Sequence, residues 1–94
     1  MLVEPTLHSI EDCEAIGSRY RMMQPVLFNV SGADKPTGRR VLDFVSGLTY
    51  ASRGTLHKVG KGAFLLLPDG VELSTDERRR LSGFGYELPS EPRS

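Results

Sequence analysis

Residues 39–69 read RRVLDFVSGLTYASRGTLHKVGKGAFLLLPD, and this stretch decides the fold. Apolar residues recur at helical spacing in its first part: Val41, Phe44, Val45 and Leu48. A loop at Ser52-Arg53-Gly54 ends the helix, and two strand-like runs follow, TLHKV and AFLLL. The intervening Gly60-Lys61-Gly62 predicts a hairpin turn. The second run is apolar throughout, which is typical of a central strand covered on at least one face.

The sequence before this stretch predicts two more strands and another helix. MLV at residues 1–3 is interpreted as a first or edge strand, where a proline soon after is tolerated. Residues 10–22 have apolar side chains at helical spacing, and VLFNV at 26–30 has strand propensity. Pro36 follows turn residues and suits the first turn of the next helix.

The sequence after this stretch predicts one more strand and one more helix. VEL at 71–73 is interpreted as a short strand, and Ser74 with Glu77 forms a capping box that opens a helix through about Leu81. The element order predicts an α/β fold: a two-layer sandwich of one mixed sheet of about five strands, two main helices and a short C-terminal helix. Residues 1–82 form the expected domain. Residues 83–94 are expected to be a flexible tail because Pro, Ser and charge dominate them.

Length, charge and hydropathy exclude several functions. The chain has 94 residues and a formal net charge of zero, which argues against nucleic-acid binding driven by phosphate neutralisation. Its longest apolar run, AFLLL, is far shorter than the roughly 20 residues of a membrane span. The single Cys13 excludes an internal disulfide and suits a reducing cytosol. A domain this small buries a limited share of its surface, so dimerisation is expected to stabilise it.

Side chains that could support catalysis or bind a metal occur singly. His8 and His57 lack Cys or carboxylate partners at the spacing of a zinc site. The Gly-Lys-Gly at 60–62 lacks the spacing of a phosphate-binding P-loop, and Asp43 has no second carboxylate at a predictable separation. The run Arg78-Arg79-Arg80 spreads around a helix and is interpreted as a solvated surface. We therefore expect a binding protein, with no catalytic residue, metal or cofactor.

A binding surface is predicted on the helix of the opening stretch. Residues 35–61 carry six Lys or Arg and one acidic residue. Arg39 and Arg40 provide charge for charge-assisted hydrogen bonds. Phe44 and Leu48 provide an apolar surface beside them, which suits a short peptide with both acidic and hydrophobic residues. The alternative is that Phe44 faces the core and the arginines are only solvated.

The order of motifs over residues 2–73 resembles the SepF family of bacterial cell-division proteins. The resemblance rests on these residues: Arg40, Val41, Leu42, Asp43, Phe44, Gly47, Tyr50, Gly54, Val59 and the strand at 64–67 with Pro68. It implies a dimeric α/β sandwich in the cytoplasm that binds the C-terminal tail of the tubulin-like protein FtsZ at the division septum. Family members tether FtsZ filaments to the membrane through an N-terminal amphipathic helix. This sequence starts directly at its first strand, so no direct membrane contact is expected.

The resemblance and the residue pattern together imply two groups of site residues. The FtsZ tail is expected to bind at Arg39, Arg40, Asp43, Phe44 and Leu48. Self-assembly, as a homodimer or a higher oligomer, is expected at Leu42, which lies off the apolar stripe, at Tyr50, and at Gly54. Pro36 and Gly38 depart from the helix formers that the family has before Arg39. Two alternatives stay open: a modulator that pairs with a full-length SepF, and a regulatory domain that binds a small molecule.

Overall fold

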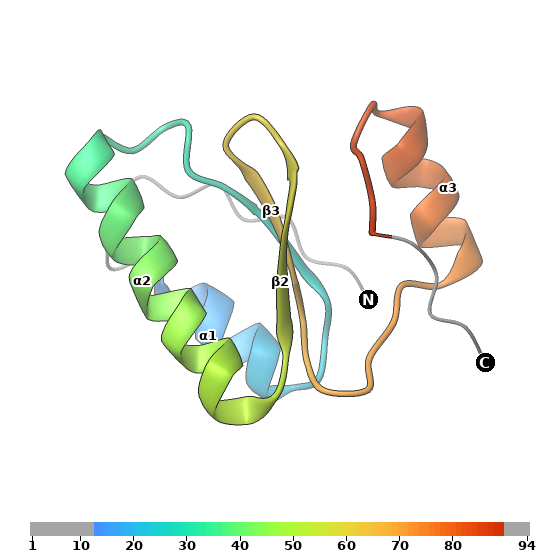
Figure 1. Cartoon of the computed structure of the whole chain (residues 1–94). Coiled ribbons are helices and arrows are strands. Elements are labelled where there is room, and N and C mark those ends of the chain that lie inside the picture. Colours follow the sequence, from blue (N-terminus) through green and yellow to red (C-terminus); the bar gives the residue numbers. More distant parts are fainter. Residues whose placement is uncertain (1–12, 90–94) are drawn as a thin grey trace.

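The computed structural model describes residues 13–89, which form three helices and three strands (Figure 1). In chain order the elements are α1 (Cys13–Arg21), β1 (Val26–Asn29), α2 (Lys35–Ser52), β2 (Thr55–Gly60), β3 (Ala63–Leu67) and α3 (Thr75–Gly83). The helix expected over residues 10–22 is confirmed from Cys13 onward. Its start, and the strand expected at residues 1–3, lie outside the described residues.

The sheet formed by the described residues has three strands in the order β1-β3-β2, and both pairings are antiparallel. This corrects the expectation of a mixed sheet of about five strands. Residues 71–73 do not join the sheet, because the chain turns at Gly70 and Leu73 packs with Leu81 of α3. The predicted hairpin and the central position of the apolar strand β3 are confirmed.

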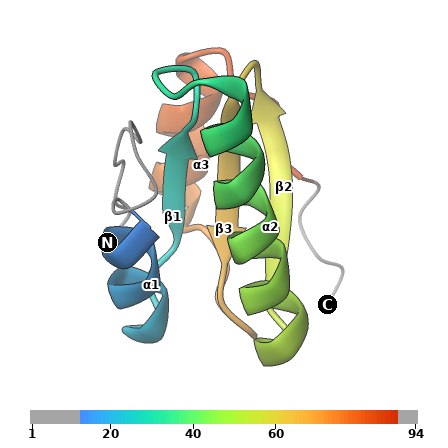
Figure 2. The same cartoon turned by 90° about the vertical axis from the view of Figure 1, so that its left-hand side faces the viewer.

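Helices cover both faces of the sheet, which corrects the expectation of two layers. α1 and α2 lie on one face and α3 on the other, as Figure 2 shows with α1 and α2 in front of the strands and α3 behind. Successive residues of a strand point to opposite faces. Leu66 therefore belongs to the core under α1 and α2, and Leu65 to the core under α3. Because β3 is apolar on both sides, each face requires its own cover.

Local sequence signals account for the boundaries of α2. Asp34 is the N-cap, and its side chain accepts a hydrogen bond of 2.8 Å from the backbone amide of Thr37. Pro36 lies in the first turn, as predicted. At the other end Arg53 adopts the left-handed conformation, with φ of 63°, that glycine usually takes after a helix.

Residues 84–89, here called the C-terminal strap, lie against the second face of the sheet. The Glu87 amide donates a 2.8 Å hydrogen bond to the Val59 carbonyl of β2. The Arg78 guanidinium donates a 2.7 Å hydrogen bond to the Pro89 carbonyl. Two side chains of the strap pack on the core under α3: Tyr86 and Leu88. The expectation of a flexible tail did not anticipate these contacts, and the domain boundary at residue 82 stays a prediction.

Candidate partner-binding surface

The outer surfaces of α1 and α2 meet in a groove of about 530 Å³, here called the α1–α2 groove. Its lining residues are Cys13, Glu14, Gly17, Ser18 and Arg21 from α1 with Phe44 and Leu48 from α2. Both helices lie on the same face of the sheet, which forms the layer beneath them (Figure 2). A concave surface with an apolar floor and a few charged groups at its rim is the usual form of a binding site.

Phe44 is the most exposed apolar side chain of the groove. It is 46% exposed, whereas its helix neighbours Val41 and Val45 are fully buried in the core. The interpretation of Phe44 as wholly a core residue is therefore wrong. Leu48 is half-buried and packs against the core, so it supports the ring from below. A half-exposed aromatic ring beside a cavity is a typical anchor for a bound partner.

Spacing along α2 divides the residues predicted to bind a partner into two groups. Arg40, Phe44 and Leu48 follow one another at intervals of four, so they lie on one side of the helix. The other two, Arg39 and Asp43, line a second hollow of about 530 Å³ between the start of α2 and the loop before it, as does Leu42 of the predicted self-assembly group. The predicted set therefore occupies two neighbouring surfaces and not one.

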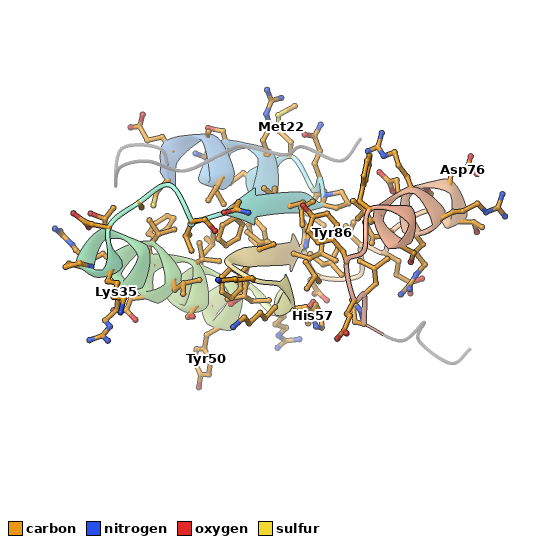
Figure 3. All side chains as sticks on the ribbon, turned by 90° about the horizontal axis from the view of Figure 1, so that it is seen from above. Met22, Lys35, Tyr50, His57, Asp76 and Tyr86 are labelled. Atoms are coloured by element: carbon orange, nitrogen blue, oxygen red, sulfur yellow. The ribbon has the colours of Figure 1, made fainter. Side chains whose placement is uncertain are left out.

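Tyr50 stands on another side of α2. Its side chain is 92% exposed and points away from the body of the molecule (Figure 3). Gly47, three positions earlier, shares this side of the helix. Apart from its own helix backbone and chain neighbours, no atom of the described residues lies within 4 Å of the place where its Cβ would be. Phe44 is six positions from Tyr50, which corresponds to a rotation of about 120° around the helix axis. Tyr50 and Gly47 thus form a surface separate from the α1–α2 groove.

The other two residues predicted for self-assembly have contacts inside the chain. Leu42 is half-buried and packs against the core under α1 and α2. A Cβ atom on Gly54 would collide with the Tyr20 hydroxyl and lie 2.7 Å from the Leu67 carbonyl oxygen. The Tyr20 hydroxyl is itself hydrogen-bonded to the Ser52 side chain. Packing within one chain is therefore sufficient to require glycine at position 54, and its role in self-assembly stays a prediction.

None of the residues predicted from the sequence to bind a partner lies on the α1 wall of the groove. Glu14 and Arg21 suit the two ends of a helix dipole, which hides a second role for either charge. Gly17 is the usable signal, because glycine inside a helix is about 1 kcal/mol less favourable than alanine. Within residues 13–89, no atom outside the backbone of its own helix and its two chain neighbours lies within 4 Å of the place where its Cβ would be, so packing among these residues does not explain it.

Within residues 13–89, no group of three or more His, Cys, Asp or Glu side chains could hold a metal ion. None of the helices in this part of the chain combines the length and hydropathy needed to cross a bilayer.

In the second hollow, the pKa of Asp34 lies below its ordinary value of 3.8 because its carboxylate accepts hydrogen bonds from Thr37, with the larger effect from the side chain and the smaller from the backbone amide.

Comparison with known proteins identifies one family. The family model described as "Cell division protein SepF" matches residues 2–73. The "Cell division protein SepF" of Rubrobacter xylanophilus is 40% identical over 81 residues, which cover 86% of this chain and 42% of the relative. That of Desulfitobacterium hafniense is 39% identical over 86 residues, 92% of this chain and 56% of the relative. This chain thus spans about half the length of these relatives.

A solved structure shares the fold. The "SepF-like protein from Archaeoglobus fulgidus" superposes with a TM-score of 0.71 at 17% sequence identity, and the match covers 80% of this chain and 93% of that one.

Proposed function

The chain belongs to the SepF family of cell-division proteins, and on that premise we propose that it is a noncatalytic adaptor of the division ring. It forms dimers, binds the C-terminal tail of FtsZ, and acts in the cytoplasm at the septum to organise or tether the ring. The observation that carries this proposal is Phe44, a half-exposed aromatic ring in a groove whose rim has charges of both signs.

The dimensions of the groove suit a short peptide. From Arg40 to Leu48 the helix advances about 12 Å, which an extended peptide covers with about four residues. Arg40 and Arg21 attract acidic residues of such a peptide, while Phe44 and Leu48 contact its apolar residues. Glu14 lies at the other end of α1 from Arg21, where it can accept a basic residue of the peptide and so favour one direction of binding.

The proposed surface for self-association is the exposed side of α2 that carries Gly47 and Tyr50. Both faces of the sheet are covered, one by α1 and α2 and the other by α3 and the C-terminal strap. Tyr50 remains as an almost fully exposed aromatic side chain beside the open space at Gly47. A second copy placed there buries both Tyr50 rings and leaves the groove open for the peptide. The same surface would serve in pairing with a full-length SepF.

Fluorescence anisotropy with a labelled FtsZ-tail peptide tests the proposal. Phe44→Ala removes the anchor, and Arg40→Glu reverses the charge one helical turn before it. Each is expected to weaken binding by about tenfold or more, equivalent to about 1.4 kcal/mol. The absence of saturable binding by the wild type at about 1 mM peptide would exclude direct recognition of the tail.

Two control variants distinguish an effect at the groove from effects of the protein's net charge and of its dimerisation. Arg39→Glu makes the same change in charge one position away, on a different side of α2, and is expected to weaken binding less than Arg40→Glu. Tyr50→Ala is expected to reduce dimerisation in sedimentation equilibrium and to leave peptide affinity unchanged. Equal effects of the two charge reversals would show that the net charge of the protein, and not the groove, attracts the peptide.

A further inference from the structure

The adaptor role leaves one charged motif of the chain unexplained. α3 carries the run Arg78-Arg79-Arg80, and Ser82 lies two positions after it. Arg79, Arg80 and Ser82 are all exposed at the C-terminal half of this helix. We propose that Ser82 is a phosphorylation site for a serine/threonine kinase that recognises arginine, and that its phosphate loosens the C-terminal strap.

The charge pattern before Ser82 suits a kinase of this class. Arg79 and Arg80 are the third and second residues before the acceptor serine. A kinase with carboxylates beside its active site binds two such guanidinium groups through charge-assisted, bidentate hydrogen bonds. Both side chains are exposed in the folded protein, so these contacts need no rearrangement of the core.

The end of α3 can open to present the serine. The helix has nine residues, and helices this short are marginal without tertiary support. Gly83 and Gly85 follow Ser82, and neither has an atom within 4 Å of the place where its Cβ would be. Glycine lowers the free energy of leaving the helix. When the last turn unwinds, Leu81 leaves the core under α3, and its carbonyl loses the hydrogen bonds that it accepts from the Phe84 and Tyr86 amides.

The transfer itself is a simple substitution at phosphorus. The Ser82 hydroxyl oxygen attacks the γ-phosphorus of ATP, and the bond from that phosphorus to the β,γ-bridging oxygen breaks with its electron pair left on ADP. The hydroxyl proton passes to the catalytic carboxylate of the kinase. The product is a phosphoserine of charge between about −1.5 and −2.

The effect of this phosphate on the C-terminal strap follows from the position of Arg78. It lies four residues before Ser82, and Arg79 lies three before, so both can reach the phosphate along one side of the helix. In the described structure the Arg78 guanidinium donates to the Pro89 carbonyl at 2.7 Å. A doubly charged phosphate competes for this donor better than a neutral carbonyl does. Loss of the Arg78 contact leaves the strap held by the Glu87 amide bond and by its apolar side chains.

Phosphorylation of the full chain in vitro tests the site. The protein is incubated with ATP and the catalytic subunit of cAMP-dependent protein kinase, and the phosphate is located by mass spectrometry. We expect one phosphate on Ser82 in the wild type and none on it in the double variant Arg79→Gln/Arg80→Gln. Ser46→Ala, which removes an exposed serine of α2 with no arginine two or three positions before it, should take up as much phosphate as the wild type. Phosphate on an isolated peptide of residues 76–86 but not on the folded protein would overturn the proposal.

Hydrogen exchange tests the effect on the strap. We expect the Glu87 amide to exchange about tenfold faster in the phosphorylated protein, in line with the loss of one hydrogen bond to a charged group. Amides of β1 and β3 serve as the internal control and should not change. Arg78→Gln without phosphate should reproduce the faster exchange at Glu87. Unchanged exchange at Glu87 after complete phosphorylation would refute the coupling between Ser82 and the strap.

Discussion

Gly54→Ala tests the account of the turn between α2 and β2. The methyl group would collide with the hydroxyl of Tyr20 and lie 2.7 Å from the carbonyl oxygen of Leu67. Tyr20 is buried and its hydroxyl is hydrogen-bonded to Ser52, so it has little room to move. Leu67 is the last residue of β3, and its carbonyl is part of the backbone. Tyr20 belongs to the core under α1 and α2, and Leu67 packs against the core under α3, so neither neighbour can yield without disturbing a core.

The expected cost has two parts. Overpacking of a core costs about 1–3 kcal/mol, and displacement of Tyr20 from Ser52 loses a hydrogen bond of about 0.5–1.5 kcal/mol. Alanine returns about 0.4–1 kcal/mol by restricting the unfolded chain. The net loss lies between about 0.5 and 4 kcal/mol, with a middle value of about 2 kcal/mol, which is a large share of the roughly 5–14 kcal/mol expected for a domain of this length. Each kcal/mol lowers the melting temperature by about 4–8 °C.

Urea denaturation at one fixed protein concentration measures the effect. Gly47→Ala is the matched control, because the same methyl group meets no atom within 4 Å and should stabilise the monomer fold by up to about 1 kcal/mol. The double variant Tyr20→Phe/Gly54→Ala should regain only part of the free energy of unfolding that Gly54→Ala loses, since the contact with Leu67 remains. A Gly54→Ala protein that is as stable as the wild type would refute the argument. Normal stability with impaired dimerisation would assign Gly54 to the self-assembly surface instead.

Two further predictions concern the helix caps. Ser74→Ala removes the side chain that accepts a hydrogen bond from the Glu77 amide in the capping box of α3. It should lower the free energy of unfolding by about 1 kcal/mol, measured by urea denaturation. An unchanged free energy would show that the box contributes nothing to stability. The lowered pKa of Asp34 makes a contribution to stability that is complete above its unfolded value of 3.8 and is lost as pH falls through the lower folded value. Melting temperatures recorded from pH 7 to pH 2 should therefore fall less steeply for Asp34→Asn than for the wild type, and parallel curves would refute a role for this carboxylate.

Elements with strong local signals could be predicted from the sequence. The N-terminal turn of α2 follows from Pro36, the hairpin from its glycines at 60 and 62, and the start of α3 from Ser74 with Glu77. Each signal acts within a few residues, so no knowledge of the fold is needed to interpret it.

Features that depend on distant partners could not be predicted. The stripe on α2 includes Phe44 and omits Leu42, yet Phe44 is half-exposed and Leu42 packs against the core, because the neighbouring layers fix the rotation of the helix. Gly54 would satisfy a helix C-cap, but Arg53 takes the left-handed conformation and Gly54 makes room for Tyr20. The strap lies in a segment of Pro, Ser and charge without periodicity, so nothing in the sequence marks Tyr86 as a core residue.

The separation of the two cores also makes the fold sensitive to cleavage after the sheet. The core under α1 and α2 draws on described residues that end with Leu66, whereas the opposite core needs Leu81 and is covered by Tyr86 and Leu88. A chain cut between Leu67 and Leu81 would keep one face of the sheet covered and leave the other as a bare apolar face, which chaperones or other chains can bind.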